Sequence, residues 1–145
     1  MKFALAQYIS PEVSDKSGSI NSFSNRLSEY FAGRDYGPGI QELYIGIVCV
    51  SPAFEKFFKQ RRPRYQRERN VYEKEGTKYE LDHTAQIDIQ LDFKVFQKLS
   101  LRKVESFIGK CILEGISQVN TLGISDFDMA AFTRDLDKEL KVTPV

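Results

Sequence analysis

Residues 79–93 read YELDHTAQIDIQLDF and hold the clearest periodic pattern in the chain. Apolar and polar side chains alternate along this stretch, and one parity is apolar from Tyr79 through Ile87 to Phe93, apart from His83. Because successive side chains of a strand point to opposite faces, the alternation is typical of a half-buried antiparallel strand. The stretch therefore predicts a sheet with one face in the core and one face outside it.

Three further strands are predicted upstream of this one. Residues 65–74 are polar and are followed by a turn at Glu75-Gly76-Thr77, so they form the expected hairpin partner. Residues 43–50, LYIGIVCV, are apolar on both parities, which is typical of a strand that is central in its sheet or covered on both sides. Residues 3–9 predict a short opening strand. The predicted sheet is antiparallel and has about four strands.

Helical periodicity flanks these strands. Apolar residues recur at spacings of three and four over residues 20–31, and Gly33 is a natural end for that helix. A second stripe covers residues 101–123, and SDFD at 125–128 fits a capping box that opens a final helix. The order β-α-β-β-β-α-α predicts one α+β domain over residues 1–145, with the helices mainly on one face of the sheet.

The composition is that of a globular protein without a strong charge bias. Hydrophobic residues make up 41% of the 145 residues and charged residues 28%, a balance that supports a core without disulfides or a metal. The formal net charge is +1, whereas domains that coat nucleic acid usually carry a clear basic excess. No secretory signal and no apolar run near the ~20 residues of a membrane span are evident, so we expect a cytoplasmic protein.

Few residues in the sequence are suited to catalysis. His83 is the only histidine, and a lone histidine is a poor zinc ligand because zinc sites need three or four. Cys49 and Cys111 lie in apolar runs and are expected to be buried thiols. Asp88 and Asp92 would stand roughly 13 Å apart on one strand face, too far for a glycosidase pair. We therefore expect no enzyme, no metal and no cofactor.

Charge is divided between the two strands of the predicted hairpin. Residues 55–78 carry nine basic and four acidic side chains, whereas residues 80–92 carry four acidic ones and no Lys or Arg. The pattern has a structural interpretation, because opposite charges on paired strands attract and an Arg-rich edge resists aggregation. It also has a functional one, because Arg and Tyr are enriched at the hot spots of protein interfaces. The candidate partner-binding residues are Arg61, Arg62, Arg64, Tyr65, Arg67, Arg69, Glu80, Asp82, Asp88 and Asp92.

A strip that carries both signs favours a protein partner, because its acidic strand repels a phosphate backbone. Two alternatives stay open. The first is a nucleic-acid-binding module that uses the Arg-rich strand, whose affinity would fall steeply with salt. The second is a small enzyme that uses His83 together with Asp82 or a neighbouring acid.

The order and spacing of these features resemble the immunity protein 44 family, small bacterial proteins that neutralise cognate polymorphic or contact-dependent toxins. The features that carry the resemblance are RDYG at 34–37, the apolar strand at 43–50, IDIQLDF at 87–93 and ISDFD at 124–128. The resemblance implies a cytoplasmic, stoichiometric inhibitor with no catalytic residues. Toxins of this class are often nucleases. The four acidic residues Glu80, Asp82, Asp88 and Asp92 are therefore candidates for docking against a basic active-site cleft.

Overall fold

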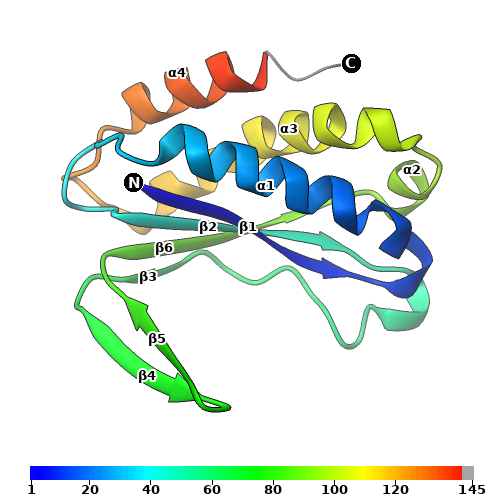
Figure 1. Ribbon diagram of the computed structural model, residues 1–145, viewed down its shortest axis with the longest axis horizontal. Coiled ribbons are helices and arrows are strands. Elements are labelled where there is room, and N and C mark those ends of the chain that lie inside the picture. Colours follow the sequence, from blue (N-terminus) through cyan, green and yellow to red (C-terminus); the bar gives the residue numbers. More distant parts are fainter. Residues whose placement is uncertain (142–145) are drawn as a thin grey trace.

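A four-stranded mixed sheet forms the centre of the molecule, and helices cover one of its faces (Figure 1). The computed structural model describes residues 1–141, apart from the side chains of Asn70, Glu80 and Leu81. The strand order across the sheet is β1-β2-β6-β3. These strands are β1 (Lys2–Ile9), β2 (Glu42–Cys49), β6 (Thr84–Gln90) and β3 (Arg64–Gln66). A separate antiparallel hairpin, called the arm below, consists of β4 (Asn70–Lys74) and β5 (Thr77–Leu81).

The helices gather on one side of the sheet and the arm lies on the other (Figure 1). The α-helices are α1 (Ser17–Phe31), α2 (Phe93–Gln97), α3 (Val104–Gly115) and α4 (Met129–Leu140). Short 3-10 turns occupy η1 (Pro11–Lys16), η2 (Pro52–Phe54), η3 (Leu101–Lys103) and η4 (Ile116–Leu122). Across residues 1–141, no helix has both the length and the apolar character to cross a lipid bilayer. The predicted α+β class, with helices mainly on one face, is confirmed.

The strand directions differ from the predicted antiparallel sheet. β1 pairs with β2 in parallel and β2 pairs with β6 in parallel, while only β3 pairs with β6 in the antiparallel sense. Parallel neighbours need long crossover connections. The chain provides them: α1 connects β1 to β2, and the segment that contains β3 and the arm connects β2 to β6. Side-chain alternation reports which face is buried and carries no information on strand direction.

The predicted long strand over residues 79–93 is divided into two strands in different sheets. His83 has a φ of 47°, in the left-handed region that turns the chain between β5 and β6. The backbone carbonyl of His83 accepts hydrogen bonds from the backbone N–H groups of Gln41 and Glu42. β6 ends at Gln90, and Asp92 caps α2. The alternation continues across the break because both strands have one polar face.

Aromatic rings fill the core between the sheet and the helices. The ring centroid of Phe31 lies 5.0 Å from that of Phe3 on β1 and 5.3 Å from that of Phe132 on α4. All three side chains are fully buried. On β2, Ile45 on one face is 0% exposed and Val48 on the other is 1% exposed, so the prediction of a central strand is confirmed.

Phe31→Ala is expected to lower the free energy of unfolding by about 3–5 kcal/mol, because it leaves a cavity among buried rings. Phe57→Ala is the matched control, since this ring is 65% exposed and its loss should change stability by less than about 0.5 kcal/mol. Urea unfolding followed by circular dichroism measures both. Equal effects of the two substitutions would contradict this account of the core.

Candidate functional site

The face of the sheet turned away from the helices, called the open face below, is polar where it crosses β1, β2 and β6. Lys2, Glu42 and Thr84 are register partners across these strands. The Thr84 hydroxyl donates to Glu42 Oε2 at 2.9 Å, and the Tyr44 hydroxyl donates to the same oxygen at 3.4 Å. The Lys2 ammonium lies 5.9 Å from the centroid of the Tyr44 ring. The carboxylate of Glu42 is therefore already hydrogen-bonded within the sheet.

Asp88, in the middle of β6, is a buried anion on this face. Its side chain is 1% exposed. Asp88 Oδ2 accepts hydrogen bonds from the Arg61 backbone N–H at 2.9 Å and from Arg61 Nε at 3.1 Å. Gly46 opposite leaves room for the carboxylate, because a Cβ there would lie 2.4 Å from Asp88 Oδ1. The pair holds the segment before β3 against the open face; residues 53–63, which contain this segment, have a sequence that does not distinguish a short helix from a loop.

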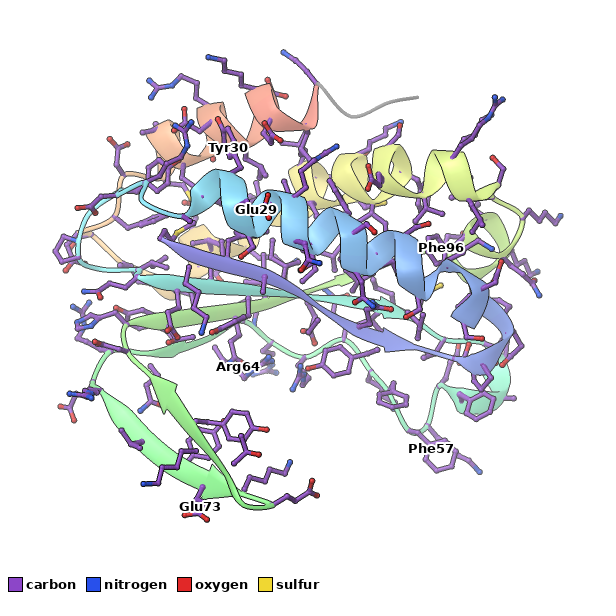
Figure 2. The ribbon with its side chains drawn as sticks, in the orientation of Figure 1. Glu29, Tyr30, Phe57, Arg64, Glu73 and Phe96 are labelled. Carbon is purple, nitrogen blue, oxygen red and sulfur yellow. The ribbon has the colours of Figure 1, made fainter. Side chains whose placement is uncertain are left out.

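Aromatic rings surround this ion pair. The Arg61 guanidinium lies 4.9 Å from the centroid of the Tyr8 ring, and the Tyr8 and Phe58 rings are 6.3 Å apart. The hydrogen bond to Asp88 raises the pKa of Arg61. Phe58 is 42% exposed and Phe57 is 65% exposed. Figure 2 shows Phe57 at the outer edge of the molecule, on the same side of the sheet as the arm.

The arm is a tight hairpin that presents two stacked tyrosines. Glu75 and Gly76 both have positive φ values, 52° and 78°, as a two-residue type I′ turn requires. Tyr72 and Tyr79 face each other across the strands with their ring centroids 5.3 Å apart and an interplanar angle of 20°. Both rings are about two-fifths exposed. The predicted turn after Lys74 is confirmed.

A groove of about 790 Å³ lies between the arm and the open face. We call it the tyrosine groove, because four of its lining residues are tyrosines, one from each of the strands β1, β2, β4 and β5. Ala6 on β1 contributes a small side chain to the lining of the groove. The groove is lined by Tyr8, Tyr44, Tyr72 and Tyr79, by the charged residues Lys2, Glu42, Lys78 and Asp82, and by Ala6 and Gln86.

The predicted arginines are largely engaged with acceptors of the protein itself. Arg61 pairs with Asp88 as described, and Arg64 lies 3.9 Å from the same carboxylate. Arg64 also donates to Gln86 Oε1 at 3.0 and 3.2 Å. Arg62 is exposed. The attraction between opposite charges on neighbouring strands, the structural interpretation of the pattern, therefore accounts for Arg64 and Asp88. Arg61 is also paired with Asp88, but from the segment before β3 and not from a strand.

The remaining predicted residues of the basic strand lie at the other end of β3. The Tyr65 hydroxyl donates to the Gly39 carbonyl, and the ring packs against the core. Arg67 lies 3.5 Å from Asp126 Oδ2 and 5.4 Å from the centroid of the Tyr65 ring. Arg69 is exposed on the link between β3 and the arm. These contacts tie β3 to the loops before β2 and α4.

The predicted acidic residues do not form one row. Asp88 is buried, and Asp92 accepts a hydrogen bond from the Val95 backbone N–H at 3.1 Å as the cap of α2. Asp82 lines the tyrosine groove, with Oδ1 2.5 Å from His83 Nδ1. The side chain of Glu80 on β5 lies outside the described residues. The turn at His83 and the end of β6 at Gln90 separate these positions.

The part of this face that β1 and β2 contribute was not predicted from the sequence. Tyr8 and Tyr44 join the predicted Asp82 in one groove because β1, β2 and β6 are neighbours. Lys2 and Ala6 have the same parity as Tyr8, opposite to the core residues of β1. That alternation was the available signal, but the pairing of β1 with β2 could not be read from it.

The cysteines and acidic residues give no sign of reaction chemistry. Burial raises the pKa of the Cys49 thiol to about 11, and burial also raises the pKa of the half-buried Cys111. In residues 1–141, no group of three or more His, Cys, Asp and Glu side chains is arranged to hold a metal ion. The exposed aromatic rings and the groove are instead suited to binding.

A family model described as immunity protein 44 matches residues 1–142. The match includes every strand of the sheet, the arm and all four α-helices. No curated protein and no solved structure matches the chain.

Asp88→Asn is expected to lower the free energy of unfolding by about 2 kcal/mol, because a neutral amide replaces the charged acceptor of Arg61. Asp137→Asn is the control, since its ion pair with Lys141 is exposed and should contribute less than about 0.5 kcal/mol. Urea unfolding measures both, and amide hydrogen exchange should show faster exchange at Arg61 in Asp88→Asn. Unchanged exchange there would contradict the anchoring role of Asp88.

The Cys49 thiol is expected to react with Ellman's reagent only after unfolding, because it is buried and its raised pKa keeps it protonated at pH 8. Cys49→Ser and Cys111→Ser separate the two signals. Fast reaction of the native Cys111→Ser variant would show that Cys49 is accessible and contradict this expectation.

Proposed function

This chain belongs to the immunity protein 44 family, and we propose that it neutralises a cognate bacterial toxin by stoichiometric binding to the toxin domain. The observation that carries the proposal is the family match, which spans residues 1–142. It covers both the helical layer and the open face.

The exposed surface supports a binding role. Large apolar side chains that remain exposed in a monomer mark interaction sites when they gather on one face. Here Phe57 lies on the side of the sheet away from the helices (Figure 2). On the same side, Phe58 packs near Tyr8, and Tyr72 and Tyr79 of the arm line the groove with Tyr8 and Tyr44. Aromatic residues contribute strongly to protein interfaces, because they bury a large area with few rotatable bonds.

A protein partner is favoured over nucleic acid by the state of the arginines. Arg61, Arg64 and Arg67 each lie within 4.0 Å of a carboxylate oxygen of the protein itself. Binding of a phosphate backbone would have to compete with those carboxylates. The basic strand therefore offers fewer donors to phosphate than its sequence indicates, and we propose no nucleic-acid-binding function.

Co-expression with the toxin domain encoded by the neighbouring upstream reading frame tests the proposal. We expect the chain to restore growth of cells that express this toxin domain and to co-purify with it as a complex of fixed stoichiometry. An unrelated toxin domain should not be neutralised, which controls for general effects on expression. Failure to associate at micromolar concentration, together with no protection, would refute the proposal.

A further inference from the structure

We propose that residues 54–62, called the aromatic segment below, form the main contact with the toxin domain and dock on an apolar recess of that domain that is bordered by carboxylates. This inference rests on the toxin-binding function proposed above. It names the segment that makes the contact and the chemistry of the surface that receives it, neither of which follows from membership of the family.

The aromatic segment exposes phenylalanine rings to solvent. Phe57 is 65% exposed, the largest exposed fraction among the large apolar side chains of the described structure, and Phe58 is 42% exposed. The ring centroid of Phe54 lies 6.3 Å from that of Phe57, so these rings form a cluster. Burial of an exposed Phe side chain is favourable by about 1.5–3 kcal/mol, and apolar side chains that gather on a monomer mark interaction sites. The cluster is therefore suited to insertion into an apolar recess.

The segment is held in shape before any partner binds. The Phe57 backbone N–H donates to the Phe54 carbonyl at 2.9 Å, which closes a turn. Asp88 holds the other end, because its carboxylate accepts from the Arg61 backbone N–H and its carbonyl accepts from Gln60 Nε2, both at 2.9 Å. A segment that is already ordered loses less conformational freedom on binding. More of the gain from burying the rings therefore contributes to affinity.

The exposed rings lie among cations that the protein itself does not neutralise. The Lys56 ammonium lies 5.2 Å from the centroid of the Phe57 ring. Arg61 is paired with Asp88 and is not counted here. The segment contains one acidic residue, Glu55. Three basic side chains of the segment are exposed, and none of them has a described carboxylate oxygen within 4.0 Å: Lys56, Lys59 and Arg62.

These cations indicate the chemistry of the partner surface. An apolar recess would bury the Phe57 ring, and carboxylates at its border would pair with the three unpaired cations around the ring. This arrangement corresponds to an aromatic anchor in a polar rim, the usual anatomy of a protein interface. A basic active-site cleft, by contrast, would repel the segment. We therefore expect the segment to contact the toxin domain outside any such cleft.

Other occupants fit the segment less well. A symmetric contact between two copies of the chain at Phe57 would bring the unpaired cations of both copies together, which is unfavourable. A flat anionic lipid surface would also approach the arm, because Phe57 and Glu73 lie on the same side of the sheet (Figure 2). Residues 70–81 contain three glutamates and two lysines, so the arm adds no attraction to lipid. Three unpaired cations on a chain of net charge +1 offer few contacts to a nucleic-acid backbone.

The decisive experiment is calorimetric titration of the toxin domain with the wild type and matched variants. We expect Phe57→Ala to raise the dissociation constant at least about 30-fold, as loss of an aromatic hot spot does. Lys59→Glu should raise it about 10-fold or more and Lys59→Gln by less, because the sign of the charge matters. The controls are Leu101→Ala, whose side chain is 54% exposed between α2 and α3, and Lys110→Glu on α3; both should bind as the wild type does. Urea unfolding verifies that each variant is folded.

A second readout locates the contact without mutation. Amide hydrogen exchange of the wild type is measured with and without the toxin domain. We expect slower exchange in residues 54–62 when the toxin domain is bound, because their backbone becomes covered, and no change in α3. Slower exchange in α3 without any change in the aromatic segment would overturn the proposal.

The outcomes separate this inference from the function on which it rests. If the wild type binds the toxin domain and Phe57→Ala binds equally well, the aromatic segment is refuted while the immunity function stands. If Lys59→Glu binds as tightly as the wild type, the carboxylate border of the recess is refuted. If the wild type does not bind at micromolar concentration and gives no protection, the function itself is refuted.

The other occupants are tested with the wild type and Phe57→Ala. The probes are phosphatidylglycerol vesicles and a labelled single-stranded oligonucleotide of mixed sequence, and we expect binding to neither. Binding of the wild type to either probe that is lost in Phe57→Ala would overturn the assignment to a protein partner. A dimer that sedimentation equilibrium detects in the wild type and not in Phe57→Ala would overturn it in favour of a second copy of the chain.

Discussion

The carboxylate of Asp88 joins parts of the molecule that approach the sheet from different directions. Its side chain holds Arg61, while its backbone carbonyl accepts hydrogen bonds from Gln60 at 2.9 Å and Gln118 at 3.1 Å. A buried carboxylate is costly unless it is paired and hydrogen-bonded. The segment before β3 must therefore lie across the open face, and Gly46 must lack a side chain. This one constraint fixes which part of the open face is covered and which part stays open beside the arm.

Much of the fold was predictable because its periodic elements have one buried face. The apolar run in β2 indicated a strand that is central in its sheet or covered on both sides, and β2 does lie between β1 and β6. The stripe over residues 20–31 indicated α1, which is also confirmed. Strand direction was not predictable, because the period of two is the same in parallel and antiparallel sheets. The break at His83 was also missed, because a positive φ at a single residue does not disturb the alternation on either side.

The candidate site was predictable only in part, for a related reason. The sequence shows that the Arg-rich and acidic stretches carry opposite charge, and the structure shows that Arg61 and Asp88 satisfy each other. The sequence does not show that β1 is the neighbour of β2, so Tyr8 and Tyr44 could not be assigned to the same face as Asp82. A site assembled from several strands needs the strand order, which local patterns do not provide.

The arm has a consequence for how proteins with this architecture diverge. In the described structure its regular pairing is only with itself, through β4 and β5, and its tight turn is specified by two residues. Substitutions on the arm therefore place little demand on the core between the sheet and the helices. Selection can alter the recognition chemistry of such a projection while it conserves the fold, much as loops vary on a rigid scaffold. New binding specificities can thus arise, or be grafted, without redesign of the domain that carries them.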